Sequence, residues 1–595
     1  MRLKLPFLLF ILLISSVVYA QKNAWKKSTS EGYLNTISID RLHQDKSEVF
    51  VLNDTEFKSQ LTGSPLRGNT SNRTSSNYVL IPEEQGHFLR FQVYEAPVFS
   101  LSLAAKYPDI KSYVGYNEQG ALLRMSISPK GVHTMITYKD RPATFMQPVK
   151  GELNTYIVYN RESKHGLETD RFICSTKDEI DRDASREVLT SREANDQTLR
   201  KFRMAVSVNG EYTTYHGGTI AGALAAINVT LARVNAVFEA DMAVTFELVD
   251  ADELIYTDAA TDPYSDNLAN WNAELQNTLN NTIGNAAYDI GHMFGASGGG
   301  GSAGCIGCVC VDGQKGSGKT SPADGVPEGD TFDIDYVAHE IGHQMGANHT
   351  YSHSTEGTGV NVEPGSGSTI MGYAGITSSN VQQNSDAYFH YVSIKQILDN
   401  LVTQTCWQAN SPLSLTNNPP VANAGSDYTI PQGTAYVLRG AATDADSGDN
   451  LTYNWEQNDS GQVTRGQFGP TRTIGAQVRS LPSSGSPDRY IPKLSRVIAG
   501  QLTETNPNSG DAWETVSTVA RDLNFALTVR DRAPTATGLH GQSSYDLMAI
   551  TVDASSGPFT VTAPNTAVTW ERVLHRPLPG MWQIQRVLPG LIARM

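Results

Sequence analysis

The stretch VAHEIGHQMGANHTYSH, from Val337 to His353, holds four of the 13 histidines in this chain of 595 residues. His339, Glu340 and His343 form the pattern H-E-x-x-H. Residues four apart lie on one face of a helix, so both imidazoles can bind a single metal ion. Glu340 lies next to them without being a ligand, which suits a general base that takes a proton from a metal-bound water. The stretch therefore predicts a helix that carries a hydrolytic metal site.

A glycine and a third histidine extend this pattern. Gly346 can end the helix in the left-handed conformation that other residues avoid, and the chain can then turn back to present His349. Three histidines leave the fourth tetrahedral position for water, which is typical of a catalytic zinc and not of a structural one. We therefore expect one catalytic Zn²⁺ bound by His339, His343 and His349, with Glu340 as the catalytic residue. The alternative, histidines packed in a core, does not require this spacing.

The sequence HEIGHQMGANH, together with STIMGYAG at 368–375, resembles the metzincin zinc endopeptidases. The resemblance implies a tight turn, the Met-turn, in which Met371 lies beneath the zinc-bound imidazoles; an ordinary core methionine is the alternative. Within the metzincins, residues 202–410 resemble the bacterial reprolysin-like, or adamalysin-type, domains. This implies an α/β catalytic domain with a mixed twisted sheet plus helices, and a substrate peptide extended along an edge segment around 297–311.

Two residues depart from the reprolysin pattern. Thr350 follows the third histidine, where reprolysins usually carry Asp and pappalysin-like metzincins carry Thr. Tyr373, two residues after Met371, is similar to the tyrosine that contacts zinc or the oxyanion in astacins and serralysins. The resemblance implies that Tyr373 is a candidate transition-state stabiliser, and a packed turn aromatic is the alternative.

Five cysteines agree with export but are too few to build a disulfide scaffold. Cys310 and Cys406 are positioned like a disulfide pair that ties the catalytic domain together. Cys305 and Cys308 can pair locally or exchange into that bridge, and a second zinc site of the three clustered cysteines is a weaker alternative. Cys174 stands alone before the catalytic domain. Its thiolate is a candidate cysteine switch that fills the open zinc position, as in latent metzincins; a buried free thiol is the alternative.

The first twenty residues, MRLKLPFLLFILLISSVVYA, combine a positive start, a short apolar run and a small-residue cleavage site at Ala20. They predict a cleaved signal peptide and hence a secreted or cell-surface protein. No later segment reads as long and apolar enough to span a bilayer, so we expect no stable membrane insertion.

Changes in composition divide the rest of the chain. We predict a signal peptide at 1–20, a β-rich propeptide at 21–199, a reprolysin-like metallopeptidase domain at 200–412, a PKD- or Ig-like β-sandwich at 413–556 and an atypical tail at 557–595. A charged connector that includes Arg200 and Lys201 is expected to be exposed and is a candidate processing site. The last 25 residues contain no Ser, Thr, Asn, Asp or Lys, which we interpret as a shifted reading frame.

The net charge of −15 and the pI near 5.4 argue against nucleic acid as a partner. Asp333 and Asp335, just before the zinc helix, are candidates for binding Ca²⁺ or for capping nearby backbone.

The histidine pattern, the signal peptide and the lone Cys174 together predict a secreted zinc endopeptidase that is made as a latent proenzyme and acts on proteins or peptides. The alternatives are a narrow-specificity processing protease of pappalysin type, and an adhesin or matrix-binding protein whose metal domain is mainly structural. The sandwich could bind an extracellular polymer or surface, or act as a spacer.

Overall fold

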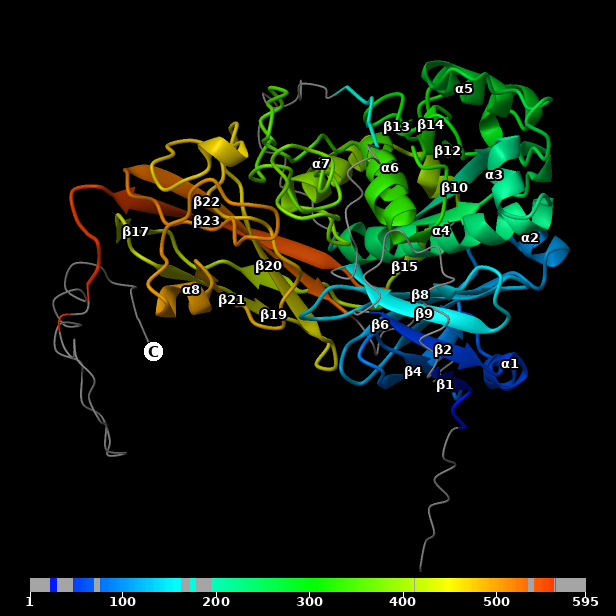
Figure 1. The fold of residues 1–595 in the computed structure, drawn as a ribbon, viewed down its shortest axis with the longest axis horizontal. Helices are drawn as coiled ribbons and strands as arrows, with labels where there is room; N and C mark the ends of the chain where they lie inside the picture. The colour runs from blue at the N-terminus through cyan, green and yellow to red at the C-terminus, as the bar shows by residue number, and fades with distance from the viewer. Residues whose placement is uncertain are drawn as a thin grey trace, which may run out of the picture.

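The computed structural model describes residues 22–28, 47–68, 75–161, 172–177, 194–410, 412–532, 540–560 and 562 (Figure 1). The predicted signal peptide at 1–20 and most of the predicted tail at 557–595 lie outside the described residues, so both stay predictions. The described chain forms three regions that follow one another in sequence and pack together, each around its own sheet.

The N-terminal region is a nine-stranded sheet in the order β1-β2-β9-β8-β7-β6-β5-β4-β3, and every neighbouring pair is antiparallel. Successive residues of a strand point to opposite faces. In β7, Met135 therefore joins a core shared with the central region, whereas Ile136 joins a separate core on the other face. The elements are β1 (Trp25–Lys27), β2 (Glu48–Leu52), α1 (Asp54–Leu61), β3 (Tyr78–Pro82), β4 (Phe88–Glu95), α2 (Leu101–Lys106), β5 (Lys111–Tyr116), β6 (Leu122–Ser128), β7 (Gly131–Thr137), β8 (Thr144–Pro148) and β9 (Thr155–Asn160). The predicted β-rich character is confirmed, and the role as a propeptide stays a prediction.

The central region has a mixed sheet in the order β11-β10-β12-β14-β13, with β15 paired to β10. The first four strands run parallel, and β13 at the edge runs antiparallel to β14. The strands are β10 (Thr198–Val208), β11 (Val244–Leu248), β12 (Ile290–Phe294), β13 (Gly300–Ser302), β14 (Gly318–Ser321) and β15 (Leu413–Ser414). The helices are α3 (Gly210–Tyr215), α4 (Ile220–Met242), η3 (Asp252–Leu254), η4 (Leu268–Asn270), α5 (Trp271–Thr282), η5 (Asn285–Ala287), η6 (Thr331–Val337), α6 (Ala338–Met345), α7 (Tyr391–Val402) and η7 (Cys406–Asn410). This arrangement confirms the mixed sheet with helices that the sequence predicts.

Helix α4 lies between the N-terminal sheet and the central sheet (Figure 1). Its composition and length would allow it to cross a membrane, contrary to the expectation that no segment after the signal peptide would qualify. However, 78% of its most apolar window is buried inside the protein. Because both sheets pack on it, a core position accounts for its apolar sequence.

The start of the central region differs from the prediction. Arg200 lies within β10, pairs in register with Val244 of β11 and is only 9% exposed. The expectation of an exposed processing site at Arg200 and Lys201 is therefore wrong, because a protease could reach this bond only if the strand left the sheet.

The C-terminal region contains a four-stranded sheet in the order β17-β23-β22-β20 and two small sheets, β16-β19 and β18-β21. Trp455, Phe525 and Ile550 belong to the core that these strands share. The elements are β16 (Val421–Asn423), β17 (Tyr428–Pro431), β18 (Tyr436–Arg439), β19 (Ala441–Thr443), β20 (Leu451–Gln457), η8 (Arg465–Gln467), β21 (Asp488–Ile491), α8 (Leu494–Ile498), β22 (Arg521–Asp531) and β23 (Ser543–Asp553). The predicted β-rich character is confirmed, and the assignment to the PKD or Ig class stays a prediction.

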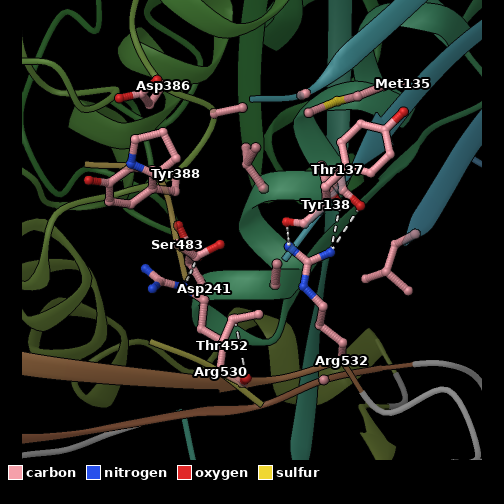
Figure 2. A pocket seen from close by; sticks show the side chains of 18 of the residues that line it. Met135, Thr137, Tyr138, Asp241, Asp386, Tyr388, Thr452, Ser483, Arg530 and Arg532 are labelled. Carbon is pink, nitrogen blue, oxygen red and sulfur yellow. Dashed lines mark hydrogen bonds and ion pairs between the residues drawn. The ribbon is translucent and has the colours of Figure 1, made fainter. Parts of the chain in front are cut away.

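The three regions meet around the pocket shown in Figure 2. Arg532, which follows β22, donates hydrogen bonds to the carbonyl oxygens of Thr137 at 3.0 Å and Tyr138 at 2.6 Å, next to the end of β7. Arg530 forms a buried ion pair with Asp241 near the end of α4 at 2.5 Å. The C-terminal region therefore packs directly on both of the other regions.

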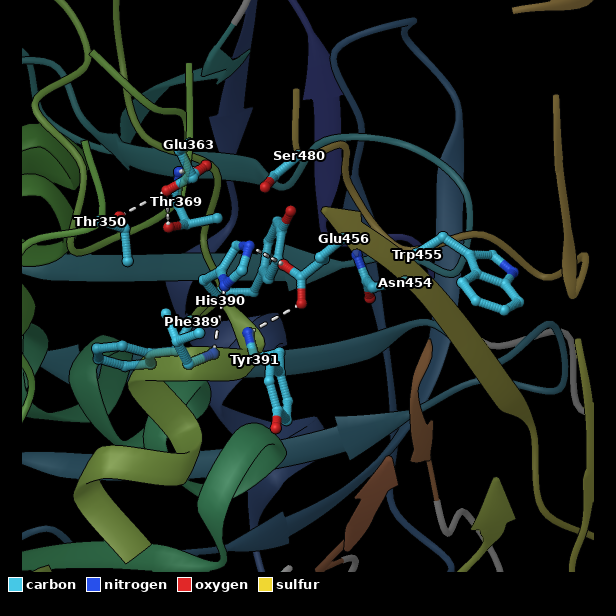
Figure 3. Close-up of polar contacts among 12 residues, drawn as sticks. Thr350, Glu363, Thr369, Phe389, His390, Tyr391, Asn454, Trp455, Glu456 and Ser480 are labelled. Carbon is cyan, nitrogen blue, oxygen red and sulfur yellow. Dashed lines mark hydrogen bonds and ion pairs between the residues drawn. The ribbon is translucent and has the colours of Figure 1, made fainter. Parts of the chain in front are cut away.

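Contacts with the central region continue along α7. Glu456 of β20 accepts a hydrogen bond from the Tyr391 backbone N–H at 2.9 Å, and its other oxygen lies 4.0 Å from His390 Nε2 (Figure 3). All three residues are buried. A carboxylate of the C-terminal sheet thus caps the first turn of a helix in the central region.

The connection between β20 and β22 packs on the loop that follows α6. Gly365 donates its backbone N–H to the Val463 carbonyl at 2.8 Å. A Cβ on Gly365 would lie 2.8 Å from the Trp513 ring, and Gly365 has a φ of +58°. Val381 shares a small core with Val463 and Trp513. The C-terminal region therefore supports the loop from outside.

Candidate metal centre and the segment that crosses it

The histidine stretch forms the end of a long helical segment. The π-helical turns of η6 run directly into α6, whose residues are all buried. Gly346 ends the helix with a φ of +129°, and a Cβ there would come within 2.9 Å of Asn400 Cβ on α7. Glycine thus permits both the turn of the backbone and the close approach of α7.

The three histidines of the pattern converge. His343 Nε2 lies 3.2 Å from His339 Nε2 and 3.1 Å from His349 Nε2. The Nδ1 atoms of His339 and His343 each lie 2.7 Å from a backbone carbonyl, that of Ile370 and that of Ala347. A carbonyl accepts a hydrogen bond from a protonated Nδ1, which leaves the Nε2 lone pairs free and directed at one shared space.

Burial decides the charge of these rings. It lowers the pKa of His339 to about 3 and lowers the pKa of His343 well below its usual value. Both rings are therefore neutral near pH 7, which is the form that binds metal ions. Lone pairs that converge at these distances repel one another unless a cation lies among them, so this donor set fits a zinc ion.

Glu340 lies on the same helix, beside the histidine ligand set. It is fully buried, and burial raises the pKa of its carboxyl group to about 7. Its Oε2 accepts a hydrogen bond from Thr176 Oγ1 at 3.1 Å. A carboxyl group with this pKa can take up and release a proton near neutral pH.

The loop after α6 brings two more predicted residues to the centre. Met371 is fully buried against α6, so closely that a Cβ on Gly342 would lie 2.6 Å from its Sδ. The ring of Tyr373 lies 4.7 Å from the ring of His349 and 5.7 Å from that of His339. These positions are compatible with a Met-turn and with a transition-state stabiliser, and both roles stay predictions.

Thr350, the residue that departs from the reprolysin pattern, helps to fix this loop. Its Oγ1 donates a hydrogen bond to Glu363 Oε2 at 2.6 Å, and Thr369 Oγ1 donates to the same oxygen at 2.5 Å (Figure 3). Glu363 is buried. It therefore links the chain after His349 to the turn that carries Met371.

Cys174, from the predicted propeptide, lies at the same centre. Its Sγ is 3.7 Å from His343 Nε2. One potential ligand atom from Cys174 and one from each of the three histidines all lie within 4.8 Å of one another. A cysteine far away in the sequence thus completes a set of four soft or borderline ligands.

The segment around Cys174 pairs with the edge of the central sheet. The Gly301 N–H donates to the Ile173 carbonyl at 3.0 Å, and the Ser175 N–H donates to the Gly301 carbonyl at 2.8 Å. The segment runs parallel to β13. A Cβ on Gly301 would lie 2.3 Å from Glu340 Oε1, so only glycine lets the edge strand come this close to the centre.

Alternate residues of this segment point toward the central region. Phe172 and Thr176 are buried, whereas Ile173 between Phe172 and Cys174 is 62% exposed. The ring of Phe172 stacks on Tyr336, with centroids 4.0 Å apart and planes 6° from parallel. Phe172, Thr176 and Tyr336 are not among the residues predicted from the sequence. Their only signal was the two-residue spacing of Phe172 and Thr176 around Cys174.

The four other cysteines form two disulfides. Cys310, in the loop after β13, is bonded to Cys406 after α7, the pair expected from the sequence. Cys305 is bonded to Cys308. The alternative of a zinc site built from Cys305, Cys308 and Cys310 is excluded, because all three sulfurs are in disulfides.

The two aspartates that precede α6 have cationic partners. Asp333 pairs with Arg233 at 2.7 Å, and Asp335 pairs with Arg161 at 2.5 Å. All four side chains are buried or nearly so. These pairs join the helical segment that carries the histidines to α4 and to the N-terminal region. A role of Asp333 and Asp335 in binding Ca²⁺ stays a prediction.

Residues 198–401 match the model of the reprolysin-like metallopeptidase family M12B. The match begins with β10 and ends within α7, so it spans the whole histidine centre. No curated protein matches the chain. Because this is a family of zinc metallopeptidases, the central region is a metallopeptidase domain, and the protein is a zinc-dependent peptide-bond hydrolase.

Proposed function

We propose that the protein is a secreted zinc endopeptidase made as a latent proenzyme. His339, His343 and His349 bind the zinc ion, and Glu340 is the general base. The observation that carries this proposal is the convergence of three buried imidazoles beside a buried carboxyl group whose pKa is raised to about 7.

The side chains at the centre divide the chemistry among them. When bound, the zinc ion supplies Lewis-acid chemistry, which acidifies water and polarises the carbonyl of the scissile bond. Glu340 takes a proton from the attacking water and then delivers it to the leaving amine, so that it ends the cycle ionised. Burial keeps the pKa of Tyr373 well above its usual value, so its hydroxyl stays protonated and can donate a hydrogen bond to the oxygen that becomes negative.

The edge strand β13 supplies the binding surface for a peptide substrate. An extended peptide can add a strand to an open sheet edge through backbone hydrogen bonds. Gly301 already makes two such bonds, to Ile173 and Ser175. In the mature enzyme a substrate takes these bonds over.

We attribute latency to residues 172–177, because they occupy the positions that water and substrate need. Cys174 fills the ligand position that water needs, Thr176 holds the oxygen of Glu340, and the backbone covers β13. We place the activating cleavage between residue 177 and the start of β10, because a cut there frees the segment and leaves the strand in its sheet. Export is supported by the predicted signal peptide and by the two disulfides, which are stable in an oxidising compartment.

The test uses the full chain and its Cys174→Ala variant, with Ser175→Ala as the matched control at an exposed neighbour. Zinc content is measured by mass spectrometry, and cleavage is measured on a peptide library. We expect one zinc ion in each protein, slow cleavage by the uncut Cys174→Ala chain, in which Thr176 and the backbone on β13 still hinder the substrate, and none by the uncut wild type or control. Full latency of Cys174→Ala would remove the switch from the proposal. A chain cut between residues 177 and 194 that binds zinc but cleaves no peptide would refute the endopeptidase.

A further inference from the structure

Three carboxylates converge in the C-terminal region, at the end of β22. Asp444 and Asp449 lie in the loop between β19 and β20, and Asp531 is the last residue of β22. Oxygen atoms from the three side chains all lie within 4.8 Å of one another. Asp531 is only 3% exposed, so solvent does little to screen the repulsion among them.

A buried amide is directed into the same cluster. Asn417 is 2% exposed, and its Nδ2 donates a hydrogen bond to Asp531 Oδ2 at 2.7 Å. The other atom of this amide, Oδ1, is buried and has no hydrogen-bond partner among the residues that the structure describes. The same is true of Asp444 Oδ2. Buried oxygens that lack a donor and lie beside carboxylates point to a cation as their common partner.

The arginines on either side of Asp531 do not neutralise the cluster. Arg530 is paired with Asp241, and Arg532 donates to carbonyl oxygens of the N-terminal region (Figure 2). The fold therefore holds three acidic groups together at a cost that a bound cation would remove.

We propose that Asp444, Asp449, Asp531 and the Oδ1 atom of Asn417 bind one Ca²⁺ ion. Carboxylate and amide oxygens are the ligands that this hard cation prefers, in an irregular shell that surrounding backbone and water can complete. Zinc prefers nitrogen and sulfur ligands, so the site is chemically distinct from the histidine centre. It lies outside residues 198–401 and does not depend on the proposed proteolysis.

The position of this site indicates what the ion does. The Asn417 carbonyl accepts hydrogen bonds from Gln197 Nε2 at 3.0 Å and from Gln542 Nε2 at 2.8 Å. Gln197 directly precedes β10, and its backbone N–H donates to Gln542 Oε1 at 2.8 Å. The ion therefore fixes the linker between the central and C-terminal regions at the point where the linker touches the start of the catalytic sheet.

The first test measures binding to the full chain carrying Glu340→Gln, which removes self-digestion. The protein is freed of divalent ions on a chelating resin, reloaded with one equivalent of Zn²⁺, and titrated with CaCl₂ by calorimetry and by thermal unfolding. We expect one Ca²⁺ per chain and a rise in Tm of about 1 °C at roughly ten times the Kd and about 3 °C at roughly a thousand times the Kd. No binding heat and no change in Tm up to about 10 mM Ca²⁺ would overturn the proposal.

Variants assign the site to these residues. Asp444→Asn and Asp531→Asn should each weaken Ca²⁺ binding at least tenfold, while Asp522→Asn, at an exposed position on the same strand, should bind as the wild type does. Because Asp531 is buried, Asp444→Asn at a partly exposed position provides the same test with less risk to folding. Without Ca²⁺, Asp444→Asn should unfold at or above the wild-type Tm, since it removes a like charge; with Ca²⁺ the order should reverse. Unchanged Ca²⁺ affinity in Asp444→Asn would exclude the site.

Discussion

The metal-binding stretch 337–349 and the covering segment 172–177 meet at one centre, yet they relate to the sequence in opposite ways. In the first, a single helix and one glycine turn set the spacing of the three predicted histidine ligands. In the second, the side chains reach the centre because their backbone pairs with Gly301, far along the chain. Local helix geometry produces a residue spacing from which the site can be predicted. Pairing between distant segments produces only an alternation of buried and exposed residues, which does not identify the partner.

The strongest test of the histidine stretch 337–349 is Glu340→Gln. This change keeps the size of the side chain and removes its ability to take a proton, so we expect kcat/KM of the activated enzyme to fall about 10²- to 10⁴-fold. Zinc content should stay at one ion per chain, because Glu340 is not a ligand. Activity within a few-fold of wild type would mean that another group moves the proton.

Phe172 offers the strongest test of segment 172–177, whose contacts could not be predicted from the sequence. A synthetic peptide of residues 170–178 should inhibit the activated enzyme by pairing with β13. Burying a Phe side chain stabilises by about 1.5–3 kcal/mol, so Phe172→Ala should weaken inhibition about 10- to 100-fold. Ile173→Ala is the control, since Ile173 is 62% exposed and should matter little. Equal losses from both changes would contradict the stacking of Phe172 on Tyr336.

Gly342→Ala tests the packing between the helix and the loop that carries Met371. A Cβ at this position would lie 2.6 Å from Met371 Sδ and 3.0 Å from Phe389 Cε1, so the Met371 side chain has to shift. We expect a loss of about 1–3 kcal/mol in the free energy of unfolding, measured by denaturant titration, together with weaker zinc binding. Gly466→Ala, where a Cβ meets no atom within 4 Å, is the matched control. Equal stability of the two variants would show that the loop is less closely packed than described.

The smallest effect is expected at Thr176. Its hydroxyl donates to Glu340 and accepts from the Ala303 N–H at 2.8 Å. Thr176→Ala in the same synthetic peptide should weaken inhibition about two- to tenfold, as expected for loss of one or two hydrogen bonds. Ser175→Ala, at an exposed residue, should have less effect. A larger loss from Ser175→Ala would reverse the assignment of which face of the segment touches the enzyme.

Much of the centre could be predicted because its determinants are close in sequence. The spacing of His339, Glu340 and His343 follows from the helix, and Gly346 marks where the helix ends. The mixed sheet was also predictable, since strands and helices with distinct periodicities alternate along residues 202–410. The start of β10 near Arg200 could not be predicted, because a basic pair in a polar stretch is typical of a connector whether or not a strand begins there.

What escaped prediction depends on contacts between regions. The stacking of Phe172 on Tyr336 and the contact of Thr176 with Glu340 arise only when β13 receives a parallel neighbour. The edge segment itself was expected over 297–311, but the strand is limited to Gly300–Ser302, because the disulfides and tight turns shape the residues that follow. The packing of the C-terminal region on the other two likewise depends on single residue–residue contacts, which no periodic sequence pattern predicts.

The hydrogen bond from Gly365 to Val463, and the packing of Gly365 against the Trp513 ring and the Ser379 carbonyl, have a consequence for how this gene can change. Recombination that exchanged the C-terminal region for another module would remove the surface against which the metal-site loop is folded. The two regions are therefore expected to be inherited as a unit. Chains shortened near residue 412 should misfold and aggregate rather than form small active proteases.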